Sequence, residues 1–127
     1  MPKPCILIVD DEKDLLRVYA RALELDGYDT QLAESAQAAT DLLAADTPDA
    51  VLLDLKMPYV NGVGLLYRLR EAYPDIPVAV VTGLSTVDDA TRREIRDLNA
   101  ELRFKPLPIV ELKALVRKLL AGRPRHD

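Results

Sequence analysis

The stretch that decides the fold is Cys-Ile-Leu-Ile-Val-Asp-Asp, residues 5–11. Its apolar part has the length of one strand and is rich in β-branched residues, and two carboxylates end it. Apolar runs without alternation are typical of strands that are buried on both faces of a sheet. Similar runs recur at residues 50–53 and 78–81, and weaker ones at 28–32 and 102–104. The sequence therefore predicts five strands.

Segments with the apolar spacing of helices separate these strands. The clearest repeats are Leu15, Leu16, Tyr19 and Leu23; Ala38, Ala39, Leu42 and Leu43; and Val87, Thr91, Ile95 and Leu98. A further helix is expected after Asn61-Gly62, and a last one from about residue 108 to residue 120. Strict alternation of strand and helix predicts an α/β fold with a parallel sheet, right-handed crossovers and helices on both faces.

Local chemistry predicts where the helices begin and end. Gly27 is expected as a left-handed C-terminal cap, and Ser35 as the N-cap of the second helix. Thr86, with Asp89 three residues later, is expected to cap the fourth helix. Pro108 is expected in the first turn of the last helix, because proline is well tolerated there.

Polar residues stand where the predicted strands end. They are Asp10 and Asp11, Asp54, Thr82, and Lys105. Because the carboxyl ends of parallel strands meet at one edge of the sheet, where ligands bind, we expect these side chains to lie together. Taken singly, the aspartates could cap a helix or open a turn, and the lysine could be a solvated strand end. Their coincidence at the ends of four strands favours a shared functional site.

The residue types in this set indicate a metal. Clustered carboxylates raise one another's pKa unless a cation compensates their charge. An all-oxygen donor set without histidine or cysteine fits a hard divalent ion, and Mg²⁺ is the expected cofactor. The first turn carries acids where a P-loop, a dinucleotide fingerprint or the phosphate loop of an FMN-binding flavodoxin would need glycine, serine or threonine.

The composition indicates one soluble domain, with 127 residues of which 49% are apolar and 30% charged. A formal charge of -4 argues against nucleic-acid binding by this chain. No charge-free run approaches the roughly 20 apolar residues of a membrane span. Without a signal peptide at residues 1–5, the chain is expected in the cytoplasm. We expect the domain at residues 1–121 and a tail or linker at 122–127.

Four motifs stand at the predicted site. They are Ile8-Val9-Asp10-Asp11-Glu12; Leu52-Leu53-Asp54-Leu55-Lys56-Met57-Pro58 with Asn61-Gly62; Val80-Val81-Thr82-Gly83; and Lys105-Pro106. Together they resemble the receiver domain of bacterial two-component response regulators, over essentially the whole chain. The resemblance implies a flavodoxin-like, doubly wound (βα)5 fold with five parallel strands in the order 2-1-3-4-5.

The same resemblance implies a role for each acidic residue. Asp54 would accept a phosphoryl group from the phosphohistidine of a histidine kinase or phosphotransfer protein. Asp11 and Asp54 would hold Mg²⁺ together with the backbone carbonyl of Lys56, and Asp10 would act through metal-bound water. The chain would then be no enzyme in the usual sense, because it would catalyse only its own phosphorylation and dephosphorylation.

The resemblance also implies a switch. Lys105 would pair with Asp54 and then with the phosphoryl group, which the Thr82 hydroxyl would also bind. The surface of the fourth helix, fifth strand and fifth helix would change, and a homodimer could form through it. Receiver domains usually have an aromatic residue three positions before the lysine, where this chain has Leu102. We therefore expect the fourth helix, with Arg92, Arg93 and Arg96, to carry more of the rearrangement.

Two other functions are compatible with parts of this pattern. A Mg²⁺-dependent aspartyl-phosphate phosphatase also places an aspartate nucleophile after a strand, but here Lys56 stands two residues after Asp54 where such enzymes have a second aspartate. A pseudo-receiver would bind partners without being phosphorylated. The complete set of aspartates, threonine and lysine argues against that alternative.

Overall fold

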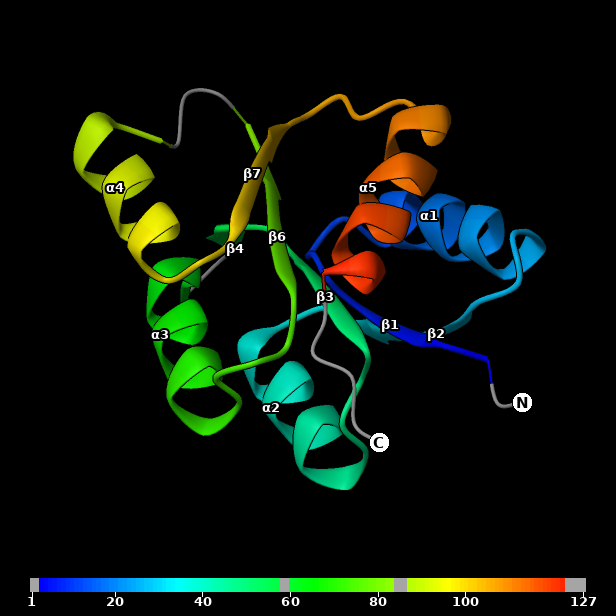
Figure 1. The fold of residues 1–127 in the computed structure, drawn as a ribbon, viewed down its shortest axis with the longest axis horizontal. Helices are drawn as coiled ribbons and strands as arrows, with labels where there is room; N and C mark the ends of the chain where they lie inside the picture. The colour runs from blue at the N-terminus through cyan, green and yellow to red at the C-terminus, as the bar shows by residue number, and fades with distance from the viewer. Residues whose placement is uncertain (1–2, 58–59, 84–86, 123–127) are drawn as a thin grey trace.

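A five-stranded sheet forms the centre of the computed structural model, which describes residues 3–57, 60–83 and 87–122 (Figure 1). The strands are β1 (Cys5–Val9), β2 (Asp29–Ala33), β3 (Ala50–Leu53), β6 (Val78–Thr82) and β7 (Glu101–Phe104). All neighbouring pairs are parallel, and the order is β2-β1-β3-β6-β7. The predicted flavodoxin-like α/β fold with strand order 2-1-3-4-5 is confirmed.

Helices cover both faces of this sheet (Figure 1). They are α1 (Lys13–Leu25), α2 (Ala36–Ala45), α3 (Gly62–Ala72), α4 (Asp89–Asp97) and α5 (Ile109–Ala121). Helices α1 and α5 pack on one face, and α2, α3 and α4 on the other. Among the residues that the structure describes, no helix is long and apolar enough to cross a membrane.

The sheet separates two apolar clusters, and its strands contribute alternate residues to each. In β1, Ile6 and Ile8 face α1 and α5, whereas Leu7 and Val9 face the opposite layer. Strands β3 and β6 are buried throughout, which explains their unbroken apolar runs. The two edge strands, β2 and β7, are only partly buried, and this is why their sequence pattern is weaker.

Most of the predicted helix ends are confirmed. The Ser35 hydroxyl accepts a hydrogen bond from the Ala38 amide at 3.1 Å, and Gly27 has a φ of 95° after α1. Thr86 lies outside the described residues, and the N-cap of α4 is instead Asp88, which accepts from the Thr91 amide at 2.8 Å. Pro108 is the N-cap of α5 and thus one position before the predicted first turn.

Two features of the chain around the sheet add to the predicted fold. Strands β4 (Lys56–Met57) and β5 (Val60–Asn61) form a short antiparallel pair directly after Asp54. In β7, Arg103 takes a place where an apolar residue is expected, and it pairs with Glu101 at 2.9 Å. Lys118 of α5 contacts the same carboxylate at 2.8 Å. A polar network therefore covers one face of this edge strand.

Candidate functional site

The predicted site residues meet at the carboxyl edge of the sheet, because backbone hydrogen bonds continue the strand pairing just beyond the strands. The Asp10 amide donates to the carbonyl of Ala33 at 3.0 Å, and the Asp54 amide to that of Val9 at 2.9 Å. The Lys105 amide donates to the carbonyl of Thr82 at 2.9 Å. The main chain thus fixes where each of these side chains starts.

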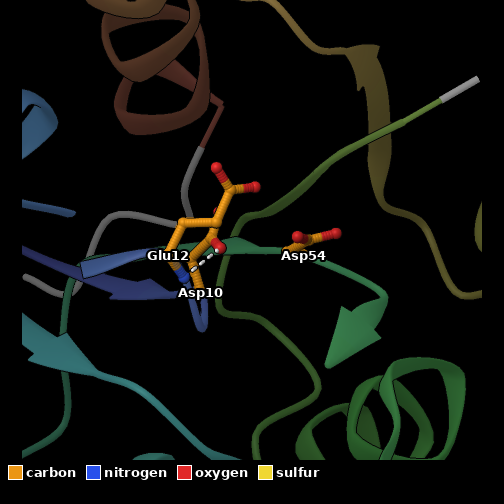
Figure 2. A group of neighbouring side chains, drawn as sticks. All are labelled: Asp10, Glu12 and Asp54. Atoms are coloured by element: carbon orange, nitrogen blue, oxygen red, sulfur yellow. Dashed lines mark hydrogen bonds between the residues drawn. The ribbon is translucent and has the colours of Figure 1, made fainter. Parts of the chain in front are cut away.

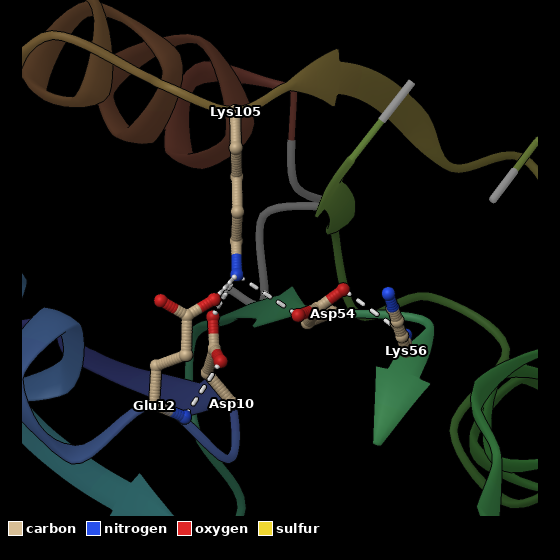
Figure 3. A network of polar contacts seen from close by, with 5 residues as sticks. All are labelled: Asp10, Glu12, Asp54, Lys56 and Lys105. Carbon is tan, nitrogen blue, oxygen red and sulfur yellow. Dashed lines mark hydrogen bonds and ion pairs between the residues drawn. The ribbon is translucent and has the colours of Figure 1, made fainter. Parts of the chain in front are cut away.

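A single ammonium group joins three carboxylates at this edge (Figure 3). The Lys105 Nζ lies 2.8 Å from Asp10 Oδ2, 2.9 Å from Glu12 Oε1 and 2.9 Å from Asp54 Oδ2. On the other side of Asp54, its Oδ1 accepts a hydrogen bond from the Lys56 amide at 3.1 Å. Charge-assisted contacts of this kind hold the phosphoacceptor candidate, Asp54, from two directions.

Burial separates two inner carboxylates, Asp10 and Asp54, from an outer one, Glu12; we call Asp10 and Asp54 the inner pair. The side chains of Asp10 and Asp54 are 6% and 5% exposed, whereas that of Glu12 is 60% exposed. Burial raises the pKa of Asp10, against the lowering effect of hydrogen bonds from Lys105 and the Glu12 amide. Burial by itself would lower the pKa of Lys105, but the hydrogen bonds to the three carboxylates outweigh it and raise that pKa.

The donor set fits a magnesium ion. Oxygens of Asp10, Glu12 and Asp54 all lie within 4.8 Å of one another (Figure 2). These are hard oxygen ligands with excess negative charge, and Mg²⁺ needs only one or two carboxylates besides water and phosphate oxygens. Asp11, predicted as a direct ligand, lies next in the chain and is half-buried, but it is not a member of this acidic cluster.

Glu12 is the site residue that the sequence reasoning missed. It is the third consecutive acid after β1, and that run of acids is the signal in the sequence that could have identified it. In the structure it occupies the N-cap position of α1 without a side-chain capping bond, so neither Asp10 nor Asp11 caps that helix. Asp10 Oδ1 instead accepts from the Glu12 amide at 3.0 Å, which tightens the turn between β1 and α1.

The predicted switch residues lie on two neighbouring strands, Thr82 at the end of β6 and Leu102 within β7. Thr82 is fully buried and is the register partner of Phe104. Leu102 is half-buried and packs against the apolar cluster beneath α2, α3 and α4. The Arg92 guanidinium of α4 lies over the Phe104 ring, 5.0 Å from its centroid. The aromatic contact between strand and helix therefore stands one position, not three, before Lys105.

Comparison with known proteins agrees with this geometry. The family model described as the response regulator receiver domain matches residues 6–117. The response regulator MprA of Mycolicibacterium vanbaalenii is 36% identical over 118 residues, which cover 91% of this chain and 49% of that protein. The transcriptional regulatory protein PrrA of Mycobacterium tuberculosis is 35% identical over 123 residues, 94% of this chain and 51% of that one. The chain thus spans about half the length of these relatives.

Solved structures show the same fold. The receiver domain of the Francisella response regulator 1452 superposes with a TM-score of 0.83 at 28% identity, covering 94% of this chain and 98% of that one. A CheY-like receiver domain protein from Methanospirillum hungatei gives a TM-score of 0.88 at 24% identity, covering 94% of both chains. With the family match over most of its length, this chain belongs to the response regulator receiver domains of two-component systems.

Proposed function

We propose that this chain accepts a phosphoryl group on Asp54 from a phosphohistidine of a histidine kinase or phosphotransfer protein, in the cytoplasm and with Mg²⁺ as cofactor. The observation that carries the proposal is the cluster of three carboxylates around the Lys105 ammonium at the carboxyl edge of the sheet. The family match and the all-oxygen donor set support it.

The transfer itself needs a nucleophile that is held in place. One oxygen of the Asp54 carboxylate would form the new P–O bond while the P–N bond to the histidine breaks and the imidazole nitrogen keeps the electron pair. In the structure the Lys56 amide and the Lys105 ammonium hold this carboxylate by its two oxygens, and the Lys56 amide would keep its hold once the metal has taken the place of the lysine. Such positioning lowers the barrier, because little reorganisation remains at the moment of transfer.

Charge on the phosphoryl oxygens would be offset from two sides. Bound Mg²⁺ would supply Lewis-acid stabilisation, with Asp11, Asp54 and the Lys56 carbonyl as ligands and Asp10 acting through water. After transfer, the Lys105 ammonium would donate to a phosphoryl oxygen, and the Thr82 hydroxyl would donate to the same group. Hydrolysis of the acyl phosphate would return the chain to its starting state, so it acts only on itself.

The output of this chemistry would be a changed surface. Thr82 at the end of β6 would move toward the phosphoryl group, and β7 and α4 would repack around it. Since Leu102 replaces the usual aromatic residue, we expect α4 as a body to carry the change, through Arg92 on Phe104. Besides the kinase, we propose a second copy of this chain as a partner, with which it would form a homodimer through the surface of α4, β7 and α5.

Phosphoryl uptake can be measured directly with acetyl phosphate, a small phosphodonor, and intact-mass spectrometry. With Mg²⁺, wild type should gain one phosphate, whereas Asp54→Asn should gain none. Without Mg²⁺, uptake should fall at least about a hundredfold, since the metal supplies much of the charge stabilisation. A folded wild type that never gains phosphate would point to the pseudo-receiver alternative, and an adduct retained in Asp54→Asn would place the chemistry on another residue.

A further inference from the structure

Glu12 holds Lys105 as closely as the buried aspartates do, yet it lies outside the inner pair. An ammonium group has three N–H donors, and in this structure Asp10, Glu12 and Asp54 take one each. The Glu12 carboxylate has no capping bond to the α1 backbone, although it stands at the N-cap. It accepts a hydrogen bond from Lys105, which follows it by 93 positions in the chain.

The oxygens that Lys105 occupies are also the oxygens that a metal ion and its bound water would need. Asp10 Oδ2 and Asp54 Oδ2 lie 2.8 and 2.9 Å from the ammonium nitrogen. A cation that enters between the two aspartates must therefore weaken or displace these contacts, because like charges repel strongly at such distances. The ammonium then needs another negative partner within reach of its flexible four-carbon chain.

Glu12 is in the right place to be that partner. Its carboxylate lies at the solvent side of the cluster, with 60% of its side chain exposed, and it already contacts the ammonium at 2.9 Å (Figure 3). Moving Lys105 toward Glu12 keeps the ammonium paired while the inner aspartates are released. Without a charge at position 12, the ammonium would pair all the more strongly with the inner pair.

We propose that Glu12 is a positioning residue that draws the Lys105 ammonium away from Asp10 and Asp54 and so opens these two carboxylates to Mg²⁺. This inference rests on the proposed function, because it assumes that the metal binds at this edge of the sheet. It adds that the charge of Glu12 controls metal affinity through Lys105 and not by direct ligation.

The test is a Mg²⁺ titration of ¹⁵N-labelled protein, followed by amide chemical shifts. Glu12→Gln keeps the shape of the side chain and removes its charge, and it should weaken Mg²⁺ binding about fivefold, the scale of a partly exposed ion pair. Glu34→Gln is the matched control, because Glu34 also follows a strand at this edge but pairs with Lys13. Its dissociation constant should stay within twofold of wild type.

A second pair of variants decides whether Glu12 acts through the lysine. In Lys105→Met, where no ammonium competes with the metal, adding Glu12→Gln should change the dissociation constant by less than twofold. A fivefold loss that persists without Lys105 would mean direct attraction of the metal and would overturn the inference, as would equal affinities of Glu12→Gln and wild type. If wild type itself binds no Mg²⁺, the proposed function fails instead.

Discussion

At each end of the sheet a cation joins several groups, and the two cations, Lys105 and Arg70, have different partners. At the carboxyl end, Lys105 faces three carboxylates. At the amino end, Arg70 of α3 donates to five backbone carbonyls, those of Tyr73, Pro74, Ile76, Leu98 and Asn99, at 2.6 to 3.4 Å. Arg70 thereby ties the end of α3 to the segments that lead into β6 and β7.

The pKa shifts of the two cations reflect this difference. Burial lowers the pKa of Arg70, whose hydrogen-bond acceptors are neutral dipoles, whereas the carboxylates around Lys105 raise its pKa. Backbone carbonyls cannot change their charge, so Arg70 serves the fold. Carboxylates can take up a metal ion or a phosphoryl group, so the partners of Lys105 can be altered by chemistry. The kind of partner thus distinguishes a cation that serves the fold from one that belongs to the proposed phosphoacceptor site.

The largest expected effect on stability is at the amino end. Arg70→Met should lower the free energy of unfolding by about 3 kcal/mol, because several carbonyls lose their donor together. Urea unfolding measures the loss, and Arg68→Met, an exposed change on the same helix, should stay within about 0.5 kcal/mol of wild type. Added Mg²⁺ should not restore Arg70→Met. A variant as stable as wild type would show that these hydrogen bonds contribute little.

Lys105→Met should behave differently. Three carboxylates would then face one another, and we expect a loss of about 2 kcal/mol without metal. Mg²⁺ should recover most of this loss by taking the place of the ammonium charge. Thermal unfolding with and without Mg²⁺ is the measurement, and an equal deficit under both conditions would contradict the electrostatic explanation.

The pH dependence of that variant has a definite sign. Because the folded-state pKa of Lys105 lies above its ordinary value of 10.5, the stability it contributes is fully present below about pH 10.5 and is lost only as the pH rises through the higher value. The deficit of Lys105→Met should therefore be the same across roughly pH 7 to 9. A deficit that vanished within this range would mean that the lysine is neutral there.

A third cation, Arg92, has an aromatic partner instead. Arg92→Ala should remove the contact with Phe104 and cost about 0.7 kcal/mol, since Arg92 is exposed. Arg93→Ala on the same helix is the control for lost side-chain length and charge, and chemical denaturation compares the two. If both variants lose equally, the ring contact contributes nothing of its own.

Asp11→Ala should have the smallest effect on stability, a gain of at most about 0.5 kcal/mol without metal, because one repelling carboxylate is removed next to the cluster. Its effect on metal binding should be larger. The rise in melting temperature that Mg²⁺ gives wild type should disappear in the variant if Asp11 is a ligand. An unchanged rise would assign the ligand role to the acidic cluster alone.

The strands and much of the site could be predicted because their signals are local. Buried strands such as β1 and β3 have unbroken apolar runs. The end of each run therefore also locates the aspartate that follows the strand. The order of parallel strands then brings Asp10, Asp54 and Lys105 together without any knowledge of side-chain packing. Ser35 was identifiable as a cap because its contact spans only three residues.

The remaining features could not be predicted because their sequence segments are too short, because two neighbouring residues are equally suitable for one position, or because they depend on contacts between residues far apart in the chain. Strands β4 and β5 have two residues each, too few for a periodic pattern. Asp88 and the predicted Thr86 are both good N-cap types, and only the observed Asp88 contact with Thr91 identifies the cap. Glu12 is exposed, and its contact is with a lysine that follows it by 93 positions in the chain.

The most direct test of the contrast between the two ends is an amide chemical-shift map with Mg²⁺ and beryllofluoride, which mimics a phosphoryl group on an aspartate. Changes should centre on residues 10–12, 54–56, 82–83 and 105, extend into α4, and leave Arg70 and the segments it holds unaffected. Asp54→Asn should show none of the beryllofluoride changes. A map centred on the amino end, or one that Asp54→Asn retains, would contradict the assignment of the chemistry to the carboxyl end.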